Sequence, residues 1–188
     1  MRSVKWGLLA LVLAVVGALI HYTLPQRDVV RIVNTEIRRM DISGPSAIFW
    51  SSPDSGTVAA ANRDIRFLEA VRPNGDPAVY RNEDTGWGWP FFFKFDSADL
   101  QAQAADYVST RDAPLWVSVR HYGWRSRLLS TFPNALAVER VDGPDALGFP
   151  WRNTVFLIVL ALVIAMIWRL SRGLWRHRIA PFFGRFRR

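Results

Sequence analysis

Hydrophobic residues are concentrated in two long runs, one near each end of the chain. The first run, 6–24, carries no charge apart from His21 when that residue is protonated, and the centre of the second, 155–168, is entirely apolar. A helix of about 20 such residues crosses the roughly 30 Å hydrocarbon core of a bilayer. We therefore predict transmembrane helices at 6–24 and 151–170, the first of them ended by Pro25.

For the first run there is an alternative interpretation, a cleavable signal peptide. Residues 16–18, Val-Gly-Ala, fit the small-residue pattern that precedes a cleavage point. Apolar residues continue through Leu19 and Ile20, however, where a polar break is expected. A membrane anchor is the preferred interpretation.

Aromatic residues near the ends of the two runs are predicted to lie at the membrane surfaces. Amphipathic rings favour the headgroup level, where one edge meets water and the other meets lipid. The predicted lipid-interface residues are Trp6, Tyr22, Trp151, Trp168 and Trp175. The tail 171–188 interleaves arginines with aromatic residues, so it is expected to lie on the membrane surface, where cationic groups attract anionic lipid.

Basic residues beside the runs predict the orientation, because short flanks rich in arginine and lysine stay in the cytoplasm. Seven arginines lie within 169–188, whereas the twenty residues before Asn153 contain only Arg140 and Arg152. The first run indicates the opposite orientation more weakly, with four arginines within 27–39.

Following the larger asymmetry, we predict a protein of the bacterial inner membrane. An even number of spans places both termini on one side of the membrane. The terminal segments 1–5 and 171–188 are then cytoplasmic, and the segment 25–150 forms a periplasmic domain.

The formal net charge of +8 does not indicate a nucleic-acid-binding face. The segment 25–150 contains all 16 acidic residues and 14 of the 24 basic residues, so the predicted periplasmic domain is nearly neutral. The excess basic charge belongs to short segments beside the apolar runs. We therefore expect membrane lipids, and not nucleic acid, among the partners.

The segment 25–150 is long enough for one domain with its own core, and its pattern is mainly β. A long loop is expected at 43–62, and the Asn74-Gly75 pair is typical of a hairpin turn. A helix is predicted to start at Ala98 with Ser97 as its cap, and its apolar positions are Leu100, Ala104, Tyr107 and Val108. The predicted strands are 29–37, 65–71, 78–81, 115–121 and 135–141.

This order of elements is the order of an OB-type small barrel. A five-stranded sheet with one packed helix is equally consistent with the pattern. In either case the predicted fold class is an α+β membrane protein, in which two terminal transmembrane helices flank a small, mainly β periplasmic domain.

Catalytic motifs are not found in the sequence. The chain has no cysteine, and it contains no P-loop, nucleophile elbow, His-Glu-x-x-His motif or dinucleotide-binding glycine pattern. His121 is the only histidine within 25–150, which excludes a multi-histidine metal site in this domain, and a lone histidine beside a strand is more often structural. No catalytic, cofactor-binding or metal-ligating residue is therefore predicted.

The densest feature is the segment 81–95, Arg-Asn-Glu-Asp-Thr-Gly-Trp-Gly-Trp-Pro-Phe-Phe-Phe-Lys-Phe, with six aromatic residues in its last nine positions. The preferred interpretation places the alternating phenylalanines of 91–95 in the core, covered by Trp87 and Trp89. The alternatives are an exposed platform for a protein partner or a glycan, and an edge that enters the outer lipid headgroups.

A second cluster, 121–127, reads His-Tyr-Gly-Trp-Arg-Ser-Arg. If an arginine of this cluster faced Glu83 or Asp84, the two clusters would form one patch, although a surface ion pair of this kind contributes under about 1 kcal/mol to stability. The candidate partner or ligand patch comprises Glu83, Asp84, Trp87, Trp89, Tyr122, Trp124 and Arg125.

Three motifs between the two runs resemble those of a known bacterial family. They are 81–90, Arg-Asn-Glu-Asp-Thr-Gly-Trp-Gly-Trp-Pro, 121–125, His-Tyr-Gly-Trp-Arg, and 132–135, Phe-Pro-Asn-Ala. Together they resemble the family called domain of unknown function 1523, over nearly the whole chain. The resemblance implies a small bacterial membrane protein and supplies no catalytic residue.

Three functions are compatible with these features. The first is an accessory or scaffolding protein that binds another inner-membrane or periplasmic protein. It is favoured by the aromatic patch and by alanines at four-residue spacing in both runs, which let helices pack closely in lipid. The second is a periplasmic module that binds glycan or lipid on its aromatic rings. The third and weakest is an enzyme that uses His121.

Overall fold

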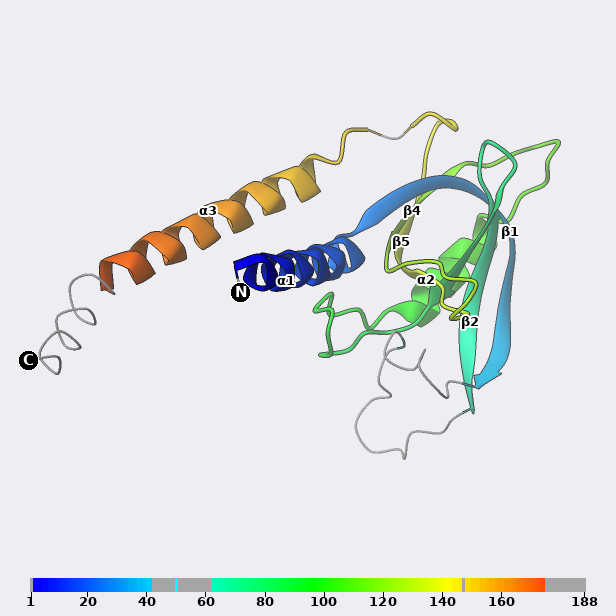
Figure 1. Ribbon diagram of the computed structural model, residues 1–188. Coiled ribbons are helices and arrows are strands. Elements are labelled where there is room, and N and C mark those ends of the chain that lie inside the picture. The colour runs from blue at the N-terminus through cyan, green and yellow to red at the C-terminus, as the bar shows by residue number, and fades with distance from the viewer. Residues whose placement is uncertain (1, 42–49, 51–61, 147, 175–188) are drawn as a thin grey trace, which may run out of the picture. The chain divides into compact units, whose positions relative to one another are not determined.

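The computed structural model of the protein describes residues 2–41, 50, 62–146 and 148–174 (Figure 1). The chain divides into two compact units, residues 1–147 and 148–188. The described part of the second unit contains α3 (Trp151–Leu174). The first contains α1 (Arg2–Thr23), β1 (Gln26–Asp41), β2 (Asn62–Val71), β3 (Pro77–Asn82), α2 (Ser97–Asp106), β4 (Val117–Tyr122) and β5 (Asn134–Arg140).

The two terminal helices each contain a segment long and apolar enough to cross a membrane, Trp6–Thr23 in α1 and Trp151–Arg172 in α3. Nearly all described side chains of these segments are exposed, so neither helix supplies the core of a soluble domain. Three of the predicted lipid-interface rings, those of Trp6, Trp151 and Trp168, are exposed. Trp175, another of the five, lies outside the described residues.

The five strands close into a barrel in the order β1-β2-β3-β5-β4, with β4 paired back onto β1. The β3–β5 pair is parallel and the other pairs are antiparallel. With α2 between β3 and β4, this is the strand order of an OB-type barrel. The α+β class, the five strands and their order along the chain agree with the prediction.

The strand β1 is the longest because it pairs with two partners in succession. Residues 26–30 pair with β4, and residues 31–41 pair with β2. A shift of register between Ile32 and Asn34 interrupts the second ladder, as a β-bulge does, and such a shift bends a strand. The predicted strand, 29–37, is too short at both ends, because ladder hydrogen bonds also hold polar residues that carry no hydrophobic signal.

Alternate residues of the strands fill the barrel interior. The α2 helix adds Leu100 and Ala104 to this core. The strand residues of the core are Val30, Ile32, Leu68, Ala70, Ala78, Tyr80, Val117, Val119, Ala135 and Val138. The alternation fixes which side of each strand faces inward, and it therefore fixes the side on which polar residues of the same strands must lie.

A second hydrophobic cluster lies on the opposite face of β2. Ile65 and Phe67, which alternate with the interior residue Leu68, are buried there together with Trp50. Of the loop predicted at 43–62, the structure describes Trp50 and Asn62, and Asn62 is already the first residue of β2. The outer face of the barrel thus has its own apolar layer.

The start of α2 differs from the prediction, because Ser97 is the first helical residue and not the cap. The backbone N–H and the hydroxyl of Ser97 donate hydrogen bonds of 2.9 and 2.8 Å to the carboxylate of Asp84. A carboxylate at a helix N-terminus satisfies a free N–H and interacts favourably with the helix dipole. Tyr107 and Val108, predicted within the helix, follow its end.

Candidate functional site

Tyr22 joins α1 to the barrel. Its ring stacks on that of Trp89, with centroids 5.7 Å apart, and meets Tyr122 and Trp124 edge-on at 6.0 and 5.5 Å. The Tyr22 carbonyl accepts a hydrogen bond of 3.0 Å from the backbone N–H of Gly123. Tyr22 was predicted at the lipid interface, but its ring is buried against the barrel. Ring and backbone contacts together fix the end of α1 on the barrel.

The residue before Tyr22 makes a second contact in this joint. Trp124 Nε1 donates a hydrogen bond of 2.9 Å to His21 Nδ1. Only Leu24 and Pro25 separate α1 from β1, and the Leu24 N–H still donates to the carbonyl of Ile20 in the helix. No flexible linker therefore lies between α1 and the barrel.

The first residues of the segment 81–95 are held by ion pairs and hydrogen bonds within the domain. The guanidinium of buried Arg81 lies over the ring of Trp50, 4.9 Å from its centroid, and 3.1 Å from Glu83 Oε2. Arg63 Nη2 lies 3.6 Å from Oε1 of the same Glu83 carboxylate. The backbone N–H of Glu83 donates to Asn134 Oδ1, and Asn134 Nδ2 donates to the Glu83 carbonyl. Glu83 therefore ties β3 to β5.

Lys94 closes the other end of the aromatic loop, which we define as residues 85–95. Thr85 N–H donates to the Lys94 carbonyl and Lys94 N–H donates to Thr85 Oγ1, both at 3.1 Å. The buried Nζ of Lys94 donates to Asn82 Oδ1. Burial lowers the pKa of Lys94 to about 8, although nearby carboxylates, chiefly that of Asp96, act to raise it. The loop thus has fixed ends.

The rings between these ends are exposed. Trp87 is 77% exposed and Phe91 64%, and Trp89, Phe93 and Phe95 are each more than half exposed. The core interpretation of the phenylalanines is therefore wrong. The alternation argument fails because residues 90–96 form no strand, and Phe93 has a left-handed φ of 50°, so successive side chains do not point to opposite faces.

The second cluster divides between the interior and the surface. Tyr122 is only 2% exposed and stacks on Phe92, so its ring is not available to a partner. Trp124 is partly exposed. Arg125 Nη1 donates to the carbonyl oxygen of Thr131, and its guanidinium lies over the ring of Phe132, 4.2 Å from the centroid.

The two clusters are linked by aromatic rings. Glu83 forms ion pairs with Arg63 and Arg81, and Asp84 accepts hydrogen bonds at the start of α2. The ring of Tyr22 instead lies between Trp89 of the first cluster and Trp124 of the second. Of the exposed members of the predicted patch, Trp89 and Trp124 therefore lie against the end of α1. The contacts described for Trp87 and Arg125 lie elsewhere, with Phe93 and Phe95 and with Thr131 and Phe132.

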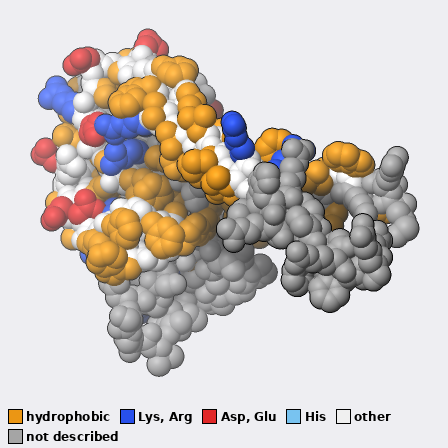
Figure 2. All heavy atoms as spheres, turned by 90° about the vertical axis from the view of Figure 1, so that its left-hand side faces the viewer, with side chains coloured by type: hydrophobic (Ala, Val, Ile, Leu, Met, Phe, Trp, Pro, Cys, Tyr) orange, Lys and Arg blue, Asp and Glu red, His pale blue; other side chains and the backbone are white. Residues whose placement is uncertain are grey.

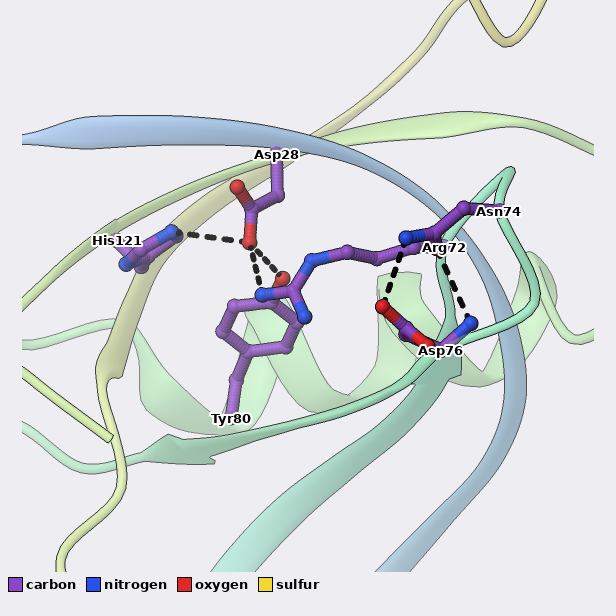
Figure 3. Close-up of polar contacts among 6 residues, drawn as sticks. All are labelled: Asp28, Arg72, Asn74, Asp76, Tyr80 and His121. Atoms are coloured by element: carbon purple, nitrogen blue, oxygen red, sulfur yellow. Dashed lines mark hydrogen bonds and ion pairs between the residues drawn. The ribbon is translucent and has the colours of Figure 1, made fainter. Parts of the chain in front are cut away.

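A polar cluster lies at one end of the barrel interior (Figure 3). Asp28 Oδ2 accepts hydrogen bonds from Tyr80 Oη at 2.6 Å and from Arg72 Nη2 at 3.0 Å. His121 Nε2 lies 3.4 Å from the same oxygen, which is an ion-pair distance without hydrogen-bond geometry. His121 itself is 5% exposed. Three side chains from three strands or their ends therefore point at one carboxylate oxygen.

These contacts shift the pKa values of the cluster. Burial acts to raise the pKa of Asp28, but His121, Tyr80 and Arg72 outweigh burial and hold that pKa well below its ordinary value. Burial, together with the Asp28 carboxylate, raises the pKa of Tyr80 above its ordinary value. Burial acts to lower the pKa of Arg72, but Asp28 outweighs it and the pKa is raised. Asp28 is thus held as a carboxylate and Tyr80 as a phenol.

Of these residues, only His121 was singled out from the sequence, as the lone histidine of the domain, and Asp28, Arg72 and Tyr80 were missed. Asp28 shares the inward alternation of Val30 and Ile32, and this pattern could have placed it inside the barrel. Its approach to His121 depends on the pairing of β1 with β4, in which Asp28 is opposite Val119. That pairing is between distant segments and has no local signal.

Comparisons with known proteins give a family and no activity. Residues 1–175 match the family described as "Protein of unknown function (DUF1523)". The chain is also similar to an uncharacterized protein of Haemophilus influenzae (strain ATCC 51907 / DSM 11121 / KW20 / Rd). The two are 33% identical over 156 residues, which cover 83% of this chain and 84% of the relative. No solved structure matches the chain.

Proposed function

The chain belongs to the DUF1523 family, and we propose that it is a non-enzymatic accessory or scaffolding protein of the bacterial inner membrane that binds another envelope protein. In this proposal α1 and α3 are transmembrane helices, both termini are cytoplasmic and the barrel stands in the periplasm. The length and apolarity of the two segments and the arginines that follow the second support this placement.

The observation that carries the proposal is the joint at Tyr22. The ring contacts of Tyr22 and the hydrogen bond between Trp124 and His21 hold the barrel in one orientation on α1. A domain that captures a diffusing ligand gains little from a fixed orientation. A domain that docks on a partner in the same membrane gains affinity, because less rotational freedom is lost on binding.

The environment of His121 supports the non-enzymatic part of the proposal. His121 lies in the barrel interior, and Asp28, its nearest carboxylate, is already bonded to Tyr80 and Arg72. A substrate would have to enter the barrel to reach the imidazole. Such an arrangement favours a structural role in closing one end of the barrel.

The proposal is tested by loosening the joint without removing either part. A flexible Gly-Ser linker is inserted between Leu24 and Pro25 in the full chain, and a linker of the same length after Gly148 serves as the matched control. The unaltered protein, extracted in mild detergent and crosslinked, is expected to retain one stoichiometric partner. The first insertion should reduce that partner's recovery more than the control insertion does. A monodisperse monomer without a crosslinked partner contradicts the proposal.

A periplasmic module that binds glycan or lipid is the second candidate, and the exposure of Trp87 favours it. The described ring contacts of Trp87 are with Phe93 and Phe95 inside the aromatic loop, so Trp87→Ala removes a platform ring without touching the joint. Trp89→Ala is less specific because Trp89 also stacks on Tyr22. Under this candidate, Trp87→Ala abolishes binding of soluble glycan fragments or lipid while thermal unfolding is unchanged.

A further inference from the structure

In the described part of the chain, four rings of the aromatic loop contact one another within the loop. Trp87 contacts Phe93 and Phe95, and Phe91 stacks on Phe93, all within the segment. These four rings are among the most exposed aromatic side chains of the described barrel unit. A contiguous exposed apolar patch of this kind marks a contact with protein or with membrane.

The charged residues at the base of this loop are directed away from the rings. Lys94 donates to buried Asn82, and Asp84 accepts from Ser97 at the start of α2. Residues 86–93 contain no charged side chain. The exposed surface of the loop is therefore apolar, apart from its backbone and the indole N–H groups, which suits the boundary between headgroups and acyl chains.

The loop lies at the end of the barrel from which α1 departs. Trp89 stacks on Tyr22 in the last turn of α1, and Phe92 stacks on Tyr122 beneath it. In Figure 1 the green loop after β3 projects from the barrel on the same side as α1. Figure 2 views the molecule from this side, where hydrophobic side chains gather. The loop surface is thus continuous with the outer end of an apolar helix.

A second loop flanks the same end of α1. Leu128, which is 93% exposed, lies in the turn 127–130 at its tip, next to Arg127, and Trp124 at its base donates a hydrogen bond to His21. An exposed leucine beside arginines matches the composition of surfaces that enter anionic membranes, where the aliphatic group enters the lipid and the cation stays at the headgroups.

The backbone conformation at Phe93 also supports a contact between the rings and an external surface. Its φ of 50° lies in the left-handed region, which a bulky residue rarely adopts, and its ring gains only partial burial in return. Unfavourable backbone conformations persist where they serve a contact. A surface that covers the rings would supply such a contact.

We propose that the aromatic loop 85–95 inserts its rings into the outer headgroup and acyl boundary of the membrane that α1 crosses, with Leu128 inserting beside it. The inference rests on the membrane placement in the proposed function and is independent of any protein partner. A lipid surface is the occupant because Tyr22 makes the loop continuous with the outer end of α1. If the loop instead docked on a protein partner, its rings would be exposed to water when the purified chain is reconstituted without that partner.

The absence of cysteine makes the test direct. Single cysteines at Phe91→Cys and Leu128→Cys are labelled with the fluorophore NBD in the full chain, reconstituted in vesicles of phosphatidylethanolamine and phosphatidylglycerol. Ile37→Cys is the matched control, because Ile37 on β1 is 63% exposed against 64% for Phe91 and lies far along the strand from α1. Leu162→Cys in α3 reports separately whether that span is in the bilayer.

The expected result is that NBD at positions 91 and 128 is quenched by lipids with a doxyl group near the headgroup. Soluble iodide should quench it several-fold less than NBD at position 37. Equal iodide quenching at 91 and 37, with Leu162→Cys quenched by doxyl lipid, overturns the loop proposal and leaves the membrane placement standing. Iodide quenching at 162 overturns the membrane placement itself, and with it both proposals. Thermal unfolding of each labelled variant confirms that the barrel is folded.

Discussion

The ring of Trp89 stacks on the ring of Tyr22, with planes inclined by 12°. Tyr22 lies in the last turn of α1 and Trp89 in the centre of the aromatic loop, so this contact connects the apolar helix to the exposed rings. An aromatic pair of this kind contributes about 0.5–1.5 kcal/mol beyond the burial of its surface. With the further pair between Tyr22 and Trp124, helix and barrel are expected to behave as one body.

Replacing Tyr22 should loosen the joint and destabilise the barrel. Tyr22→Ala removes a buried ring that touches Trp89, Tyr122 and Trp124, and truncation of a buried aromatic residue costs about 3–5 kcal/mol. Tyr22→Phe keeps the ring contacts and is the matched control, with a smaller loss. The unfolding midpoint of each variant is measured in detergent by near-ultraviolet circular dichroism during heating. Equal midpoints for Tyr22→Ala and the unaltered protein would contradict the claim that Tyr22 holds α1 on the barrel.

Gly123 tests the backbone part of the same joint. Its φ of 90° is unfavourable for any residue with a Cβ, whereas a Cβ added there would meet Tyr22 at 3.5 Å, an ordinary contact. Gly123→Ala is therefore expected to lower the free energy of unfolding by about 1–2 kcal/mol through backbone strain alone. At Gly143 an added Cβ would meet no atom within 4 Å and φ is ordinary, so Gly143→Ala should have little effect on the free energy of unfolding. Chemical denaturation compares the two, and the account fails on this point if they are equal.

Asp28 should make the stability of the barrel depend on acid. The pKa of Asp28 is lower in the folded chain than in the unfolded chain. Its contribution to the free energy of unfolding is therefore complete above its pKa in the unfolded chain, and it is lost as the pH falls below that pKa. We expect the free energy of unfolding to fall progressively below about pH 5, and Asp28→Asn to flatten that fall.

The matched control for Asp28 is Asp64. Asp64 pairs with Arg39 at 3.1 Å, but both side chains are largely exposed, and such pairs contribute little. Asp64→Asn should leave the pH dependence of unfolding nearly unchanged. A flat acid profile in the unaltered protein, or equal profiles in Asp28→Asn and the unaltered protein, would show that the polar cluster is not formed.

Lys94 should make the stability of the barrel depend on pH in the alkaline range as well. Burial lowers its pKa to about 8, whereas its ordinary value is 10.5, so between these values the unfolded chain binds more protons than the folded chain. The free energy of unfolding should therefore rise between about pH 8 and pH 10. Lys94→Met removes this rise, and Lys5→Met, which replaces the other lysine of the chain, preserves it. Urea denaturation across this range distinguishes the two variants.

Local patterns in the sequence were sufficient for the order of elements. Alternation and the Asn74-Gly75 turn located the β2–β3 hairpin, in which Gly75 has a φ of 89°. Predicted strand bounds erred where pairing extends into polar residues, most clearly in β1. These are features that depend on neighbours in the sequence, which is why they could be predicted.

Long-range contacts account for what could not be predicted. The phenylalanine alternation of 91–95 indicated a strand, but Thr85 and Lys94 close that segment into a loop and turn its rings outward. Tyr22 was assigned to lipid because its position in the helix was known and its neighbour Trp89 was not. The capping of α2 by Asp84 likewise depends on a contact across 13 residues.

The central claim is that α1 and the barrel form one rigid body, and a distance distribution across the joint tests it most directly. Spin labels are attached at Val12→Cys on α1 and Val108→Cys after α2, both exposed positions. The distance between them is measured by pulsed electron–electron double resonance on the full chain reconstituted in vesicles. The account predicts a single narrow distribution that broadens in Tyr22→Ala and when a linker follows Leu24. A distribution that is already broad in the unaltered joint, and that the linker does not broaden further, would contradict it.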